Sequence, residues 1–284
     1  MNSKKLFNDL VKGIAIDESQ DEIQSMVYLL LEHFFSISRS EVFSEKNIEL
    51  TSSDEKRVRD AIGRINTGEP VQYILEETEF YGRMFIVNPS VLIPRPETEE
   101  LVRLVIDHIK NHEDKRSRIL DIGTGSGCIP ITLGLEVPHA EIFATDVSVA
   151  ALEVANENAN RLNVNVEFIQ NDILSDDIPC RNLHVVVSNP PYISVKEKST
   201  MKDNVLLYEP HQALFVTGDD PLLFYETIAK KAHEMLQSNG LLAVEISEHR
   251  GVEVMQLLKK WGYTEIELVK DLFGKDRIIK GIRP

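Results

Sequence analysis

Residues 263–282 read YTEIELVKDLFGKDRIIKGI, two stretches rich in β-branched and aliphatic residues on either side of a short segment around LFGK. Both stretches favour strands. A crossover to a parallel neighbour needs a dozen or more residues. The short gap therefore predicts that the chain ends in an antiparallel strand pair.

Upstream of this pair, strand and helix patterns alternate. We expect strands at residues 119–122, 141–146, 166–170, 184–188 and 241–246. This alternation is typical of a parallel doubly wound sheet with helices on both faces. With the terminal pair added, the sequence predicts an α/β fold with a seven-stranded mixed sheet and one reversed strand. A nicotinamide-binding Rossmann domain is instead expected to stay parallel.

The first part of the chain has a helical pattern. In DEIQSMVYLLLEHFF the apolar residues recur every three or four positions, and Ser52 with Glu55 predicts a capping box for a later helix. The segment TEFYGRMFIV, centred on Gly82-Arg83, predicts a β-hairpin. We therefore expect a helical recognition domain at 1–77, a hairpin linker at 78–90 and the α/β domain at 91–284.

Composition excludes several classes of protein. The 284 residues carry a formal charge of -15 and are 42% hydrophobic, so extended binding along a nucleic acid is not expected. The apolar runs are too short to span a membrane and no signal peptide is recognisable. Cys128 and Cys180 show no metal-binding spacing. We expect a cytoplasmic protein without a membrane anchor or a metal site.

Residues suited to a ligand follow the first three strands of the predicted sheet, whose carboxyl ends share one edge. After the first strand, Gly123-Thr124-Gly125-Ser126-Gly127 allows a tight turn and a close approach of the backbone to a ligand. Asp146 can accept both hydroxyls of a ribose, and Asp172 can accept from an adenine amino group while Ile173 packs on the ring. These residues predict a nucleoside pocket, but they suit NAD equally well.

The fourth strand end distinguishes the two ligands, because it reads Asn189-Pro190-Pro191-Tyr192. Proline has no N–H donor, so the chain stops pairing as a strand here. The Asn189 side-chain oxygen and the Pro190 carbonyl can accept the two N–H groups of a planar nitrogen, and Tyr192 can lie against its plane. The segment resembles the signature of S-adenosylmethionine-dependent methyltransferases that modify amide or amino nitrogens.

Motifs throughout the chain resemble one family, the peptide-chain release factor N5-glutamine methyltransferases (the PrmC/HemK group). The matching segments are GEPVQYI (68–74), EFYG (79–82), VLIPRPETEELV (91–102), LDIGTGSG (120–127), SNPPYI (188–193), Glu209-Pro210 with Ala213-Leu214, and Asp271, Gly274 and Arg277. The resemblance implies a class I methyltransferase fold. It also implies methylation of the glutamine in the Gly-Gly-Gln motif of class I release factors, with S-adenosylmethionine as donor and S-adenosylhomocysteine as product.

The resemblance also implies roles for individual residues. It assigns the cofactor to Gly123, Thr124, Gly125, Ser126, Gly127, Asp146, Ile173 and Asn189, whereas Asp172 is added from its position. Catalysis falls to Asn189, Pro190 and Tyr192, and Pro191 joins them in binding the glutamine. The sequence departs from the family pattern at Ser247 and Arg250, where glycine and glutamine are usual, and at Pro221.

Three other functions remain open at this point. An N6-adenine or N2-guanine nucleic-acid methyltransferase would use the same Asn-Pro-Pro-Tyr segment, although it usually carries a basic recognition region. A non-catalytic protein that binds release factors or nucleosides would need only the pocket. An NAD-dependent oxidoreductase would share the glycine loop but has no use for the paired prolines.

Overall fold

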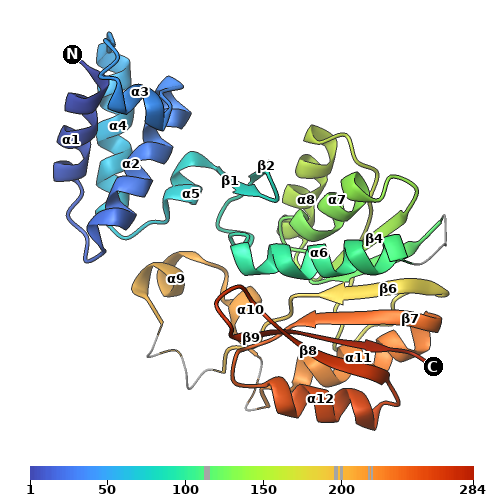
Figure 1. Ribbon diagram of the computed structural model, residues 1–284. Helices are drawn as coiled ribbons and strands as arrows, with labels where there is room; N and C mark the ends of the chain where they lie inside the picture. Colours follow the sequence, from blue (N-terminus) through green and yellow to red (C-terminus); the bar gives the residue numbers. More distant parts are fainter. Residues whose placement is uncertain (112–115, 195–197, 199–200, 217, 219) are drawn as a thin grey trace. The chain divides into compact units, whose positions relative to one another are not determined.

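The computed structural model describes residues 1–111, 116–194, 198, 201–216, 218 and 220–284. The chain divides into two compact units. The first comprises Met1–Glu76 together with Lys202–Tyr208, and the second comprises Glu77–Met201 together with Glu209–Pro284. Figure 1 shows the helices of the first unit and the central sheet of the second.

The first unit is helical. Its elements are α1 (Ser3–Gly13), α2 (Gln20–Phe35), α3 (Arg39–Phe43), α4 (Ser52–Ile65), α5 (Val71–Leu75) and α9 (Asp203–Tyr208). The apolar positions of α2 behave as their spacing predicts, since Ile23, Val27, Leu30 and Leu31 are buried in a core shared with α1, α4 and α5. Burial of this apolar stripe stabilises helices that would be marginal in isolation.

The predicted capping box at α4 was wrong by one residue. The Thr51 side chain accepts a hydrogen bond from the Asp54 N–H, and the Asp54 carboxylate accepts from the Thr51 N–H at 3.0 Å. Ser52 is instead the first residue of the helix. Both sequence pairs have the polar residue and the acid three positions apart, so spacing alone could not separate them.

The short helix α9 belongs to the helical unit although it follows the α/β strands in sequence. Lys202, just before α9, pairs with Glu18 at 2.8 Å. At the other end, the Tyr208 hydroxyl donates to the Thr67 carbonyl at 2.9 Å. The segment that follows the Asn-Pro-Pro-Tyr motif is thus anchored at both ends of α9 on residues from the first part of the chain.

The second unit begins with the hairpin of β1 (Glu77–Phe80) and β2 (Arg83–Ile86), which pair antiparallel. Its turn consists of Tyr81 and Gly82, with φ values of +51° and +70°. The predicted centre at Gly82-Arg83 was wrong by one position. Two consecutive positive φ values match the right-handed twist of a two-residue hairpin.

The seven-stranded sheet has the predicted mixed topology. Its strands are β3 (Arg118–Ile122), β4 (Glu141–Asp146), β5 (Glu167–Gln170), β6 (Leu183–Ser188), β7 (Leu236–Glu245), β8 (Thr264–Lys270) and β9 (Asp276–Ile282). They lie in the order β5-β4-β3-β6-β7-β9-β8. Neighbours from β5 to β7 are parallel, whereas β9 pairs antiparallel with both β7 and β8. The reversed strand predicted from residues 263–282 is confirmed.

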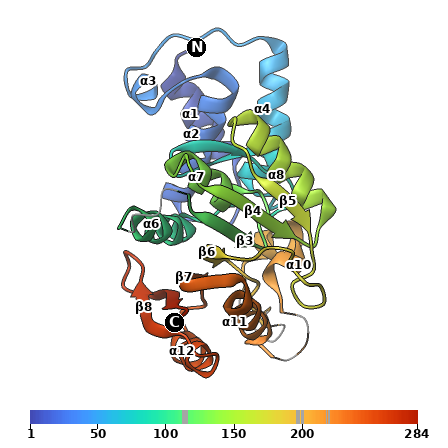
Figure 2. The same cartoon turned by 90° about the vertical axis from the view of Figure 1, so that its right-hand side faces the viewer.

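Helices cover both faces of this sheet (Figure 2). Alternate strand residues point to opposite faces. Ile119, Val185 and Leu241 pack with α6 (Pro96–Asn111), α7 (Cys128–Glu136) and α8 (Val149–Arg161). Leu120 and Leu242 pack with α11 (Leu223–Met235) and α12 (Gly251–Lys260) on the other face. The short α10 (His211–Leu214) lies between α9 and α11 in sequence.

Candidate functional site

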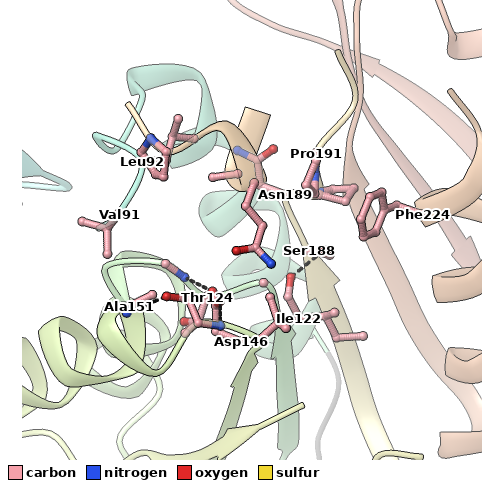
Figure 3. A pocket seen from close by; sticks show the side chains of 18 of the residues that line it. Val91, Leu92, Ile122, Thr124, Asp146, Ala151, Ser188, Asn189, Pro191 and Phe224 are labelled. Atoms are coloured by element: carbon pink, nitrogen blue, oxygen red, sulfur yellow. Dashed lines mark hydrogen bonds between the residues drawn. The ribbon is translucent and has the colours of Figure 1, made fainter. Parts of the chain in front are cut away.

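A cavity of about 760 Å³ lies in the second unit, at the carboxyl ends of its parallel strands. This is within the range of small-molecule sites. Residues after β3, β4, β5 and β6 line it together with the segment before α6 (Figure 3). The predicted ligand residues among its lining are Gly123, Thr124, Gly125, Ser126, Asp146, Asp172, Ile173, Asn189, Pro190 and Pro191.

The glycine loop after β3 is held against β4. The N–H groups of Gly123 and Thr124 both donate to the Thr145 carbonyl at 2.9 Å. Gly123 and Gly125 have φ values of +76° and +55°, and a Cβ on either would meet no atom within 4 Å. This part of the loop therefore offers bare backbone to a ligand.

Gly127 has a different role in the same loop. It does not line the cavity in the described part of the chain. Its φ is +79°, and a Cβ there would lie 2.9 Å from Ile131 Cδ1 and 3.1 Å from Ala155 Cβ. Gly127, the N-cap residue of α7, therefore permits close packing of α7 against α8.

Asp146, at the end of β4, ties the loop to the cavity wall. One carboxylate oxygen accepts from the Gly125 N–H and the other from the Ser148 N–H, each at 2.9 Å. Burial raises the pKa of this carboxyl, and the backbone N–H groups of Ser148, Gly125 and Val147 oppose the shift. Each oxygen keeps a second lone pair, so the carboxylate can still accept from a ligand hydroxyl.

The loop after β5 forms the next part of the wall. Asp172 accepts from the Leu174 N–H at 2.9 Å, and Ile173 is buried. Asn171, the preceding residue, is also buried and lines the cavity. A carboxylate beside an aliphatic side chain can bind the polar edge and the face of one flat ring.

Asn189 follows the last paired residue of β6, because the pairing of this strand with β3 and β7 ends at Ser188. Its side chain reaches into the cavity toward the strand ends that carry Ile122 and Asp146 (Figure 3). The Asn189 amide Nδ2 donates to Thr98 Oγ1 at 3.2 Å. Beyond the prolines, Ile193 exchanges backbone hydrogen bonds with Leu214 and Val216.

Tyr192 lies apart from the other residues of its motif. It does not line the cavity within the described residues but packs against the core on the α11 and α12 face. Burial, with the nearby charge of Glu245, raises the pKa of its hydroxyl to about 12. A stacking role for Tyr192 stays a prediction that requires its ring to reach the cavity.

Three charged or polar pairs, of which two include a residue that lines the cavity, were not assigned from the sequence. Thr98 Oγ1 donates to Glu245 Oε2 at 2.7 Å. Arg95 pairs with Glu209 at 2.5 Å, and Arg277 pairs with Asp271 at 3.1 Å. All of these residues except Glu245 belong to the segments IPRPETE, Glu209-Pro210 and Asp271–Arg277. The motifs marked them, but their pairing did not follow from spacing.

Asp121 and Asn158 were also missed. Asp121 is fully buried at the end of β3. Burial raises its pKa to about 7, the charge of Asp146 adds to the shift, and the Thr124 hydroxyl opposes it. Asn158 in α8 donates to the carbonyls of Ile86 and Ser126, both at 2.9 Å. It thereby joins the hairpin to the glycine loop.

The departures from the family pattern are accommodated without backbone strain. Neither Ser247 nor Pro221 adopts a positive φ, so glycine is not required at either position. Arg250 is the N-cap residue of α12 and pairs with Glu253 at 3.0 Å.

The described residues lack two further kinds of feature. They contain no group of three or more His, Cys, Asp or Glu side chains arranged to hold a metal ion. Within the same residues, no helix combines the length and the apolar character needed to cross a bilayer.

Comparisons with known proteins match both parts of the chain. The Methyltransferase small domain matches residues 97–223, and the PrmC N-terminal domain matches residues 15–75. The release factor glutamine methyltransferase of Flavobacterium psychrophilum is 41% identical over 98% of both chains. That of Bacteroides thetaiotaomicron is 40% identical over 93% of this chain and 94% of its own.

A solved structure supports the fold assignment. The chain resembles a methyltransferase from Pyrococcus furiosus with a TM-score of 0.51 and 18% identity, over 82% of this chain and 99% of that one. At this identity the likeness concerns the fold alone.

Proposed function

Because the chain belongs to the release factor glutamine methyltransferase family, we propose that it methylates the side-chain amide nitrogen, N5, of the glutamine in the Gly-Gly-Gln motif of class I release factors. The observation that carries this proposal is the position of Asn189. Its carboxamide lies in the same cavity as the glycine loop. A methyl donor and a planar nitrogen can therefore meet there.

The donor in this proposal is S-adenosylmethionine, and the product is S-adenosylhomocysteine. The residues present fit this group. The bare backbone of Gly123 and Gly125 suits its amino-acid portion, Asp146 suits the ribose hydroxyls, and Asp172 with Ile173 suits the adenine. When bound, the cofactor supplies a methyl group on a positively charged sulfur with a good leaving group.

The protein's own contribution is to orient the acceptor. An amide nitrogen is a weak nucleophile, because its lone pair is delocalised into the carbonyl. In the proposed arrangement Asn189 Oδ1 and the Pro190 carbonyl accept the two N–H groups of the substrate glutamine and turn its nitrogen toward the donor. The Pro190 carbonyl lies beyond the last paired residue of β6. Orientation of this kind lowers a barrier by several kcal/mol.

The helical unit is the part of the chain that we assign to recognition of the protein substrate. We propose that residues 1–77 recognise the release factor, and that the enzyme acts in the cytoplasm, where translation terminates. The formal charge of -15 favours a protein substrate over a nucleic-acid duplex. This charge also disfavours the alternative of an N6-adenine or N2-guanine methyltransferase.

The test is methyl transfer from labelled S-adenosylmethionine to a purified class I release factor, with mass spectrometry of the Gly-Gly-Gln peptide. We expect one methyl group on the glutamine and none on a release factor with that glutamine changed to alanine. Asn189→Ala should lower the turnover number by about 100-fold or more and largely keep cofactor binding. Asn160→Ala, an exposed asparagine in α8, is the matched control. Label that enters only total RNA would overturn the proposal in favour of the nucleic-acid alternative.

A further inference from the structure

Three side chains from distant parts of the second unit form a continuous hydrogen-bond chain at the wall of the cavity; Thr98 and Glu245 are buried and Asn189 is half-buried. Glu245 ends β7, Thr98 lies in the first turn of α6, and Asn189 follows β6. Thr98 Oγ1 lies 2.7 Å from Glu245 Oε2 and 3.2 Å from Asn189 Nδ2. Thr98 and Glu245 are 3% and 2% exposed, so water does not compete for the hydrogen bond between them.

The number of hydrogens on each group determines the direction of the chain. A threonine hydroxyl has one hydrogen and two lone pairs, and an ionised carboxylate only accepts. When the Thr98 hydrogen is directed to Glu245, Thr98 Oγ1 can only accept from Asn189. The donating side of the carboxamide, Nδ2, then faces Thr98, which leaves Oδ1 on the opposite side.

We propose that Thr98 and ionised Glu245 are positioning residues that hold the Asn189 carboxamide with its oxygen presented to the acceptor N–H in the cavity. This inference rests on the proposed methylation of a glutamine amide. It adds two residues that act through Asn189. Thr98 lines the cavity, and Glu245 lies behind it without lining the cavity in the described part of the chain. A reversed carboxamide would present N–H groups to the N–H groups of the substrate, so the orientation matters for transfer.

The charges around Glu245 act in both directions. Burial raises the pKa of its carboxyl to about 7, Thr98, Arg277 and Arg95 lower it, and Glu97 raises it. Arg277 is itself held by Asp271 at 3.1 Å. The remaining titratable groups that respond to the Glu245 charge are Cys128, Tyr192 and Tyr225.

When Glu245 is protonated, the hydrogen-bond chain no longer fixes the orientation of the Asn189 carboxamide. A neutral carboxyl can donate its hydrogen to Thr98 Oγ1. The Thr98 hydroxyl can then donate to Asn189. A carboxamide rotated by 180°, with Oδ1 facing Thr98, would accept that hydrogen bond. Turnover should therefore rise with pH through about 7 as Glu245 ionises.

The first test compares turnover and cofactor affinity in matched variants. Thr98→Val removes the hydroxyl with little change of shape and should lower the turnover number by about 10-fold or more. It should keep the cofactor dissociation constant within about twofold, because the proposed effect is on the orientation of the Asn189 carboxamide toward the acceptor. Thr98→Ser restores the hydroxyl and should recover turnover to within about threefold. Thr132→Val removes another buried threonine hydroxyl of the same unit and should leave turnover unchanged.

The second test separates positioning from a structural role. Glu245→Gln has no ionisable group and should abolish the rise of turnover through pH 7. In isotope-labelled protein, the side-chain amide resonances of Asn189 should shift with a midpoint near pH 7 in the wild type and not in Glu245→Gln. This spectroscopic measurement does not depend on methyl transfer. It therefore tests the positioning roles of Thr98 and Glu245 even if the release factor is not the substrate.

Two results would overturn the inference. One is a Thr98→Val variant that methylates the release factor at the wild-type rate. This result would leave the proposed function standing. The other is an Asn189 amide resonance that does not respond to pH. Absence of methylation by the wild type, with the pH-dependent Asn189 shift present, would instead remove the proposed function alone. If Thr98→Val does not fold, Glu245→Gln and the wild-type resonance still decide between these outcomes.

Discussion

Arg95 and Glu209 form an ion pair across 114 residues of sequence, with Arg95 Nη2 2.5 Å from Glu209 Oε1. The second carboxylate oxygen accepts from the Ile93 N–H at 3.2 Å. The Glu209 side chain is 2% exposed, whereas that of Arg95 is 34% exposed. One buried carboxylate therefore joins the segment before α6 to the segment before α10, and both segments line the cavity.

This asymmetry predicts that the two partners are not equivalent. Arg95→Ala leaves a buried carboxylate without its cation and should lower the free energy of unfolding by about 3 kcal/mol. Glu209→Gln keeps an oxygen for Ile93 and lets the Arg95 guanidinium turn to water, so it should cost only about 1 kcal/mol. Urea denaturation measures both. The exposed pair of Arg103 and Asp107 supplies the control, since Arg103→Ala should change stability by less than about 0.5 kcal/mol. Equal losses for Arg95→Ala and Arg103→Ala would contradict the role given to burial.

We expect substitutions of Gly127 and Gly125 to have different effects, the first mainly on stability and the second mainly on cofactor binding. Gly127→Ala introduces a Cβ 2.9 Å from Ile131 and should lower the free energy of unfolding by roughly 3 kcal/mol, from backbone strain and overpacking together. Gly125→Ala meets no atom within 4 Å and should cost only about 1 kcal/mol from its positive φ. Its methyl group projects where the cofactor backbone contact is proposed, so Gly125→Ala should weaken cofactor binding more. Denaturation measures the loss of stability in both variants, and calorimetric titration measures their cofactor affinity. Equal losses of stability and of affinity in the two variants would contradict these separate roles.

The buried carboxyl of Asp121 predicts a pH-dependent stability difference. Its pKa rises from 3.8 when unfolded to about 7 when folded, so the folded state binds the proton more tightly. The stabilisation from this proton is complete below about pH 4 and is lost as the pH rises through about 7. Asp121→Asn does not titrate. The stability of this variant relative to the wild type should increase by up to about 1.4 kcal/mol per pH unit across that window. Denaturation curves measured at several pH values give this difference directly, and a constant difference would show that folding does not raise the pKa of Asp121.

Local patterns were enough to place the strands along the chain, to identify the reversed strand and to locate the loops that carry the cavity. Apolar runs, glycine turns and the short gap after residue 271 indicate where strands end and which strand reverses. The reversed β9 agrees with that prediction, whereas the order β5-β4-β3-β6-β7-β9-β8 was not predicted. The positions after parallel strands share one edge of any such sheet. Gly123, Asp146 and Asn189 could therefore be assigned to one cavity without knowledge of side-chain contacts.

Local patterns were less reliable wherever two neighbouring residues offered the same chemistry. Thr51 and Ser52 are both good N-caps, and only the helix start in the folded chain distinguishes them. The hairpin turn likewise moved by one residue, to Tyr81-Gly82. Tyr192 is the larger difference, because the direction of a side chain after two prolines depends on what surrounds it. In this structure it packs into the core of the α11 and α12 face.

The amino-acid sequence by itself determined the sheet topology, the glycine loop and the Asn-Pro-Pro-Tyr segment, because each depends on residues that are close together along the chain. Only the tertiary structure decided that Thr98 lies between Glu245 and Asn189, that Arg95 meets Glu209, and that α9 belongs with the helical unit. The side-chain contacts among these join residues that are 91 or more positions apart in the sequence. They depend on how helices pack on a sheet of given register, which no local periodicity encodes.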